Sequence, residues 1–174
     1  MPAAARPFIT ALVILLVAAG PAGAQGEQTL TCAFESRVAL DPGVTLTPAQ
    51  GTYQGDGVAR CAGVYDGERV DGSGSITYEG LGGSSGPIAE QFGGDTCLLG
   101  SGTGTVEVQI ESVEGTAVAI QAQYDLVRIG VVGYATGDQL AATFQFIPDV
   151  GPDCVYTEIR EATVRGQALF SDVL

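Results

Sequence analysis

Apolar and polar residues alternate with a period of two along most of the chain from residue 28 onward. In the first such segment the apolar residues fall on even positions, as Leu30, Cys32 and Phe34 show. Successive side chains of a β-strand point to opposite faces, so this alternation predicts a strand with one buried and one solvated face. The same pattern recurs through the chain, and no segment longer than a turn has helical spacing. We therefore expect an all-β fold.

Short turn signals separate the alternating segments. Asp66-Gly67 joins two such segments, as expected for a tight hairpin, because both residues tolerate positive φ. Glu114-Gly115 is predicted to turn between the two strands of another hairpin. Roughly eight to ten strands fit into the chain at this spacing. We predict an antiparallel up-and-down β-barrel, or a strongly coiled sandwich close to one, because closing a sheet removes its exposed edges.

Residues 97–110, CLLGSGTGTVEVQI, carry alternate glycines and raise the question of a phosphate-binding loop. Such a loop leads into a helix whose N-terminus binds the phosphate, and the P-loop form also needs a lysine. The chain has no lysine, and the glycines stand in phase with Val106, Val108 and Ile110. The segment is therefore predicted to be a strand whose inward glycines allow bending or close backbone approach.

The N-terminal residues have the three-part layout of a secretory signal peptide. Arg6 precedes an apolar run from Phe8 to Gly20, and Ala22-Gly23-Ala24 supplies the small residues before a cleavage site. The run is shorter than the roughly 20 residues of a membrane span. We predict cleavage after Ala24, with an uncleaved anchor as the alternative. Residues 25–174 then form one secreted domain, extracellular or peripheral to the cell envelope, with no further membrane span.

The chain is strongly acidic, with 20 Asp and Glu against 7 Arg and a formal net charge of −13. Loss of Arg6 with the signal leaves 6 − 20 = −14. Such a charge repels nucleic acid and anionic membrane surfaces. It suits solubility, and it is also compatible with a cationic partner or a divalent metal.

Four cysteines, Cys32, Cys61, Cys97 and Cys154, all follow the predicted signal. An even number in an exported chain favours two disulfides, and no pair has the two-residue spacing typical of a zinc site. Cys32 and Cys61 fall on neighbouring predicted strands, whereas Cys97 and Cys154 each follow a loop that ends in aspartate. From this pattern we predict the pairs Cys32–Cys61 and Cys97–Cys154, among the three connectivities that are possible.

Missing residue types exclude several catalytic chemistries. The chain has no histidine and no lysine, so a Ser-His-Asp triad, a Cys-His pair and a lysine Schiff base are all excluded. A glycosidase needs two facing carboxylates, but Glu35, Asp71 and Asp125 fall on the outward phase of strands. We therefore expect no catalytic residues and no cofactor, and leave enzyme activity as the less favoured possibility.

Calcium is a minor alternative, since it needs only clustered oxygen ligands. The candidate loops are Asp66-Gly67-Glu68 with Asp71, and Asp149 with Asp153. Neither has the spacing of an EF-hand, and ordinary turn chemistry accounts for both.

Residues 80–96 form a long Gly- and Ser-rich loop, in which Ile88 and Phe92 have the spacing of one helical turn. This loop is either a lid over the barrel mouth or a flexible connection.

The residues expected to contact a ligand in the lumen are Ile88, Phe92, Tyr78, Tyr124 and Phe144. The favoured function is non-catalytic binding of a small apolar ligand or an extracellular partner. The alternatives are a barrel-mouth isomerase, cyclase or glycosidase that uses carboxylate and tyrosine groups, and an envelope-associated structural protein.

Overall fold

The structure is a computed structural model that describes residues 29–149, 154 and 157–171. This part of the chain contains eight strands and one short helix. In chain order they are β1 (Thr29–Val44), β2 (Gly51–Tyr65), β3 (Glu68–Gly82), α1 (Gly86–Phe92), β4 (Leu99–Glu111), β5 (Ala117–Ile129), β6 (Val132–Gly137), β7 (Leu140–Pro148) and β8 (Ile159–Ser171). The predicted signal, residues 1–24, lies outside the described residues.

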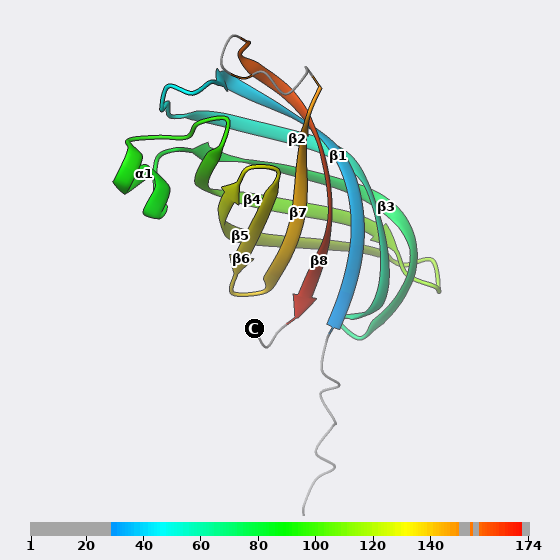
Figure 1. Ribbon diagram of the computed structural model, residues 1–174. Coiled ribbons are helices and arrows are strands. Elements are labelled where there is room, and N and C mark those ends of the chain that lie inside the picture. Colours follow the sequence, from blue (N-terminus) through cyan, green and yellow to red (C-terminus); the bar gives the residue numbers. More distant parts are fainter. Residues whose placement is uncertain (1–28, 150–153, 155–156, 172–174) are drawn as a thin grey trace, which may run out of the picture.

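The strands form one closed antiparallel sheet in the order of the sequence (Figure 1). Each strand pairs with the next along the chain, and β1 closes the sheet by pairing with β8, with Thr29 opposite Ser171. The predicted up-and-down barrel is therefore confirmed, at the lower end of the expected strand number. Closure pairs the first and last strands, which would otherwise be the two edges of the sheet.

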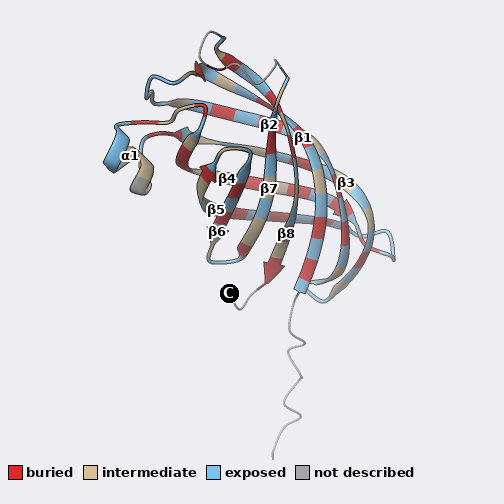
Figure 2. Cartoon of the chain, in the orientation of Figure 1, coloured by how far each residue is buried: buried red, intermediate tan, exposed pale blue. Residues whose placement is uncertain are grey.

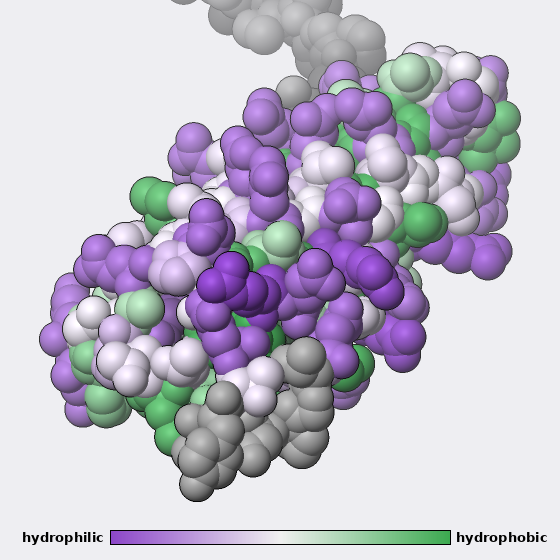
Figure 3. Space-filling model, turned by 90° about the horizontal axis from the view of Figure 1, so that it is seen from above, coloured by the Kyte–Doolittle hydropathy of each residue, from purple (hydrophilic) through white to green (hydrophobic). Residues whose placement is uncertain are grey.

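Buried and exposed residues alternate along the strands, as the sequence period predicted (Figure 2). In β5, for example, Val118, Ile120 and Ala122 are buried and the residues between them are exposed. The largest fully buried side chains, among them Leu30, Ile120 and Phe170, come from strands far apart in sequence and meet inside the barrel. Hydrophilic residues dominate the outer surface in the view from above (Figure 3). The interior thus holds the apolar core.

The residue types of Asp41-Pro42-Gly43 are typical of a turn, and the sequence predicts that they end the first strand. They lie inside β1 instead, so this prediction is wrong. Pairing with β8 is regular up to Ala39 opposite Glu161 and resumes at Val44 opposite Ile159. Between these two pairs the chain advances by five residues in β1 (44 − 39) but by only two in β8 (161 − 159), so the extra residues of β1 form a bulge. A bulge accommodates turn-forming residues, including a proline that cannot donate to the ladder, without ending the strand. The Asp41–Pro42 peptide bond is cis.

The sequence also predicts a short strand of its own over residues 154–160, which the described residues of this range do not form. Cys154 lies in a turn, and β8 begins only at Ile159. Residues 155 and 156 lie outside the described part of the chain.

Part of the predicted 80–96 loop belongs to regular secondary structure, namely to the end of β3 and to a short helix. β3 continues to Gly82, and the segment around Ile88 and Phe92 is the helix α1, which ends at Gly93 in the left-handed conformation (φ 79°). The helix packs against the outer face of β4. Ser101, fully buried beneath it, accepts a hydrogen bond from the Ala89 N–H (3.3 Å) and donates one to the Ser85 carbonyl (2.6 Å). Within the described residues, no helix is long and apolar enough to cross a membrane.

Both predicted disulfides are present. Cys32 and Cys61 are directly opposite on β1 and β2, with Cα atoms 4.0 Å apart, and both are buried. Cys97 and Cys154 join the segment before β4 to the turn before β8. Disulfides form and persist in oxidising compartments, so the pair is consistent with an extracellular location.

Candidate functional site

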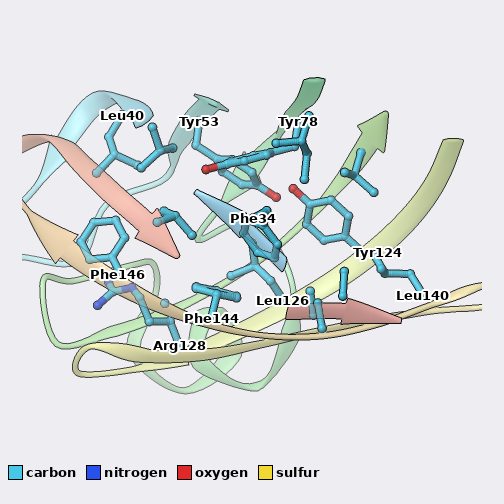
Figure 4. A pocket seen from close by; sticks show the side chains of 18 of the residues that line it. Phe34, Leu40, Tyr53, Tyr78, Tyr124, Leu126, Arg128, Leu140, Phe144 and Phe146 are labelled. Atoms are coloured by element: carbon cyan, nitrogen blue, oxygen red, sulfur yellow. The ribbon is translucent and has the colours of Figure 1, made fainter. Parts of the chain in front are cut away.

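An apolar cavity of about 120 Å³ lies inside the barrel and is lined by inward residues of all eight strands (Figure 4). Apolar cavities of roughly 150 Å³ in other proteins accept benzene-sized molecules and stay dry when empty. The cavity is therefore the part of the described structure best suited to a small molecule.

Three of the five residues predicted to contact a ligand line this cavity, namely Tyr78, Tyr124 and Phe144. The other two, Ile88 and Phe92, lie on α1 outside the barrel wall and do not line it. The Phe92 side chain is exposed to solvent at 45% of its full area. The structure thus brings together the three predicted residues of the strands but not the two of the helix.

A row of small residues explains why space remains among the large aromatics. Ala135 on β6 is opposite Ala142 on β7, which is opposite Ala168 on β8, and all three line the cavity. Because alanine side chains are only methyl groups, this row fills little of the barrel interior and leaves space beside it. Bulky aromatic residues and small residues therefore both line the interior, and the small ones form a continuous row across three strands.

The glycines of residues 97–110 belong to β4, which confirms the strand interpretation. Two of them, Gly100 and Gly104, make room for polar side chains inside the barrel. A Cβ on Gly104 would stand 2.6 Å from the Tyr53 hydroxyl oxygen and 2.7 Å from that of Tyr124. A Cβ on Gly100 would lie 3.3 Å from Nε of Arg128 and 3.4 Å from Oδ2 of Asp95.

Three phenols gather on one side of the cavity (Figure 4). Tyr53 donates a hydrogen bond to the Thr103 carbonyl at 3.1 Å and shares another with Tyr124. Since Tyr53 has one proton and a carbonyl only accepts, Tyr124 is the donor in that second bond. Burial is the main cause that raises the pKa of both phenols far above the ordinary value.

The third phenol, Tyr78, lies 2.8 Å from the Ser36 hydroxyl, which contacts the Val164 carbonyl at 3.4 Å. The arrangement that satisfies both contacts has Tyr78 donating to Ser36 and Ser36 donating to the carbonyl. Burial raises the pKa of Tyr78 to about 12. All three phenols are therefore neutral at physiological pH, and each phenol proton is already donated to another group of the protein.

Arg128 is a buried cation at the other side of the cavity (Figure 4). Its NH1 donates to the carbonyls of Cys97 (3.0 Å) and Gly130 (2.8 Å), and its NH2 donates to that of Thr96 (2.7 Å). The guanidinium also stacks on Phe146, with 4.7 Å between its carbon and the ring centroid. These contacts tie β5 and β7 to the segment that carries the second disulfide.

Asp95, in the loop before β4, supplies the carboxylate that lines the cavity near Arg128. Its Oδ1 accepts a hydrogen bond from the Ser101 N–H at 2.7 Å. Burial raises the pKa of Asp95, and the Ser101 N–H and the charge of Arg128 partly oppose this effect. The contact ion pairs among the described residues, Arg160–Glu158 and Arg165–Glu35, are on the outer surface.

The cavity offers limited catalytic chemistry. Asp95 is the one carboxylate among the described residues that line it, so the facing carboxylate pair of a glycosidase is not formed there. The predicted calcium loop at Asp66-Gly67 is a hairpin turn, with φ values of 50° and 78°. In the part of the chain that the structure describes, no group of three His, Cys, Asp or Glu side chains is placed to hold a metal. Asp153 of the second candidate loop is outside that part.

Tyr53, Arg128 and Asp95 were not identified from the sequence. Arg128 could have been found from the sequence, because it falls on the same inward phase of β5 as Val118 and Ile120. Asp95 could not, because it belongs to a loop without periodicity.

No protein-family model matches the chain, and no curated protein is significantly similar to it in sequence.

Proposed function

We propose that the protein is a secreted, non-catalytic binding protein whose barrel lumen holds a small, largely apolar molecule. The single observation that carries this proposal is the apolar cavity of about 120 Å³, lined from all eight strands. A core filled to ordinary packing density has few voids larger than a water molecule. Secretion is supported by the signal-like N-terminus and by the two disulfides.

The first test is native mass spectrometry of residues 25–174, secreted into an oxidising compartment. We expect a mass above that of the doubly oxidised chain, with the excess lost on denaturation. The released molecule identifies the ligand class. A bare mass, together with no binding of toluene or benzyl alcohol in calorimetric titrations, contradicts the proposal.

A cavity-filling variant tests whether the lumen is the binding site. Ala142→Leu places three extra carbons beside Ala135 and Ala168, so we expect at least a tenfold loss of ligand affinity with the fold retained. Ala33→Leu is the matched control, because Ala33 lies on the outer, exposed face of β1. Equal affinity of the two variants would place the ligand outside the barrel.

Turnover is a distinct outcome of the same experiments. The released molecule can be incubated with fresh protein and followed by mass spectrometry. A chemical change that Asp95→Asn abolishes would favour the alternative of a barrel enzyme that uses carboxylate and tyrosine groups.

A further inference from the structure

We infer that the lumen selects neutral molecules that carry a hydrogen-bond donor, and that it rejects carboxylates. This inference rests on the proposed function, since it concerns which ligand the same cavity accepts. It follows from where the polar groups of the cavity direct their protons and charges.

The guanidinium of Arg128 is not available to an anion. Among the described residues that line the cavity, Arg128 is the one cation. Both hydrogens of NH1 and one of NH2 are already donated to backbone carbonyls. A ligand carboxylate would have to displace these bonds or use the remaining edge of the guanidinium.

That remaining edge lies close enough to Asp95 for the two charges to interact. Nε and NH2 of Arg128 and Oδ2 of Asp95 all lie within 3.4 Å of the point where a Cβ on Gly100 would stand. The Asp95 carboxylate therefore already balances the guanidinium charge, and a second carboxylate would face an anion. An uncompensated charge in an apolar cavity is costly to desolvate.

The phenols offer lone pairs in preference to protons. Tyr124 donates to Tyr53, which donates to the Thr103 carbonyl. Tyr78 donates to Ser36, which contacts the Val164 carbonyl. A ligand carbonyl or carboxylate would have to break one of these chains, whereas a ligand hydroxyl can donate to a phenolic oxygen or to Asp95 and leave them intact.

The size of the cavity limits the rest of the molecule. A volume of about 120 Å³, with aromatic and aliphatic walls, suits a single ring or a short aliphatic chain. The predicted ligand class is therefore a small aromatic or aliphatic alcohol, phenol or amide.

Three probes of nearly equal size test the inference: toluene, benzyl alcohol and benzoate, titrated calorimetrically into residues 25–174 at pH 7.5. We expect benzyl alcohol to bind at least as tightly as toluene, and benzoate at least tenfold more weakly than benzyl alcohol. Benzoate binding as tightly as benzyl alcohol overturns the selectivity but leaves the binding function in place. Failure of all three to bind overturns the selectivity, and together with a bare mass in native mass spectrometry it overturns the proposed function as well.

Asp95→Asn tests the origin of the discrimination. It removes the competing anion and retains the shape, so benzoate should gain at least fivefold in affinity while toluene changes less than twofold. Asp125→Asn, on the exposed outer face of β5, is the control and should change neither. A gain in benzoate affinity that is equal in both variants would show that the overall charge of the protein, and not Asp95, excludes anions.

Discussion

The guanidinium carbon of Arg128 lies 4.7 Å from the centroid of the Phe146 ring, so a residue of β5 stacks on a residue of β7 across the short strand β6. From this position Arg128 also reaches the carbonyls of Thr96 and Cys97. One side chain thus connects the barrel wall, the cavity and the segment of the second disulfide.

Arg128→Met should be strongly destabilising, because it leaves three backbone carbonyls without their charged donor. We expect a loss of about 3 kcal/mol in the free energy of unfolding, measured by urea denaturation. Arg60→Met, on the exposed face of β2, serves as the control and should stay within about 0.5 kcal/mol of wild type. Equal stability of the two variants would mean that the bonds of Arg128 contribute little.

Two glycines on the inward phase of strands should respond in opposite ways to substitution. Gly104→Ala brings a Cβ to 2.5 Å from the Glu79 carbonyl oxygen and crowds two phenols, so we expect a loss of about 2 kcal/mol. Gly72→Ala meets nothing within 4 Å, and its smaller unfolded-state entropy should stabilise the fold by about 0.5 kcal/mol. Urea denaturation of both variants decides this, and a similar loss in both would contradict the space-making role of Gly104.

Removing either disulfide should weaken the fold by a similar amount. The bridged residues are 29 and 57 positions apart, and loop-closure entropy gives about 3.6 and about 4.2 kcal/mol. We expect the double variants Cys32→Ala/Cys61→Ala and Cys97→Ala/Cys154→Ala each to lose stability on this scale in thermal or urea unfolding. Wild-type stability in either double variant would refute its bridge as a stabilising element.

Asp95 should make the fold less stable as the pH rises from mildly acidic values. Burial raises its pKa in the folded state above the unfolded value, so the folded protein binds the proton more tightly. Its favourable contribution is complete below the unfolded pKa of about 4 and is lost as the pH rises through the folded pKa. The difference in unfolding free energy between wild type and Asp95→Asn, measured from pH 3 to 8, isolates this effect. A difference that is independent of pH would contradict it.

The buried phenols should resist ionisation. Tyr78 has a pKa raised to about 12, and those of Tyr53 and Tyr124 are raised further, so their absorbance changes should appear only at strongly alkaline pH. Because these folded-state values exceed the unfolded value of about 10, stability should fall as the pH rises above that value. Spectrophotometric titration at 295 nm measures both effects. Tyr78→Phe should lack the step near pH 12, and persistence of that step would assign it to another tyrosine.

The period-two alternation of the sequence determined the all-β class, which residues of each strand face inward, and the inward phase of Tyr78, Tyr124 and Phe144. These features are local, because neighbouring side chains on a strand necessarily point to opposite faces. Strand adjacency and loop position also favoured, among three possible connectivities, the two disulfide pairs that the structure contains. The bulge at Asp41-Pro42-Gly43 was missed because local turn chemistry was overridden by pairing with β8.

Only the tertiary structure decided how the cavity is assembled. Closure of the barrel places the alanines of β6–β8 in one row and sets Gly100 and Gly104 against polar side chains from other segments. It also brings Asp95, Arg128 and Phe146 together from a loop and two strands. Such juxtapositions depend on sheet register and on contacts distant in sequence, which a local pattern of residues does not encode.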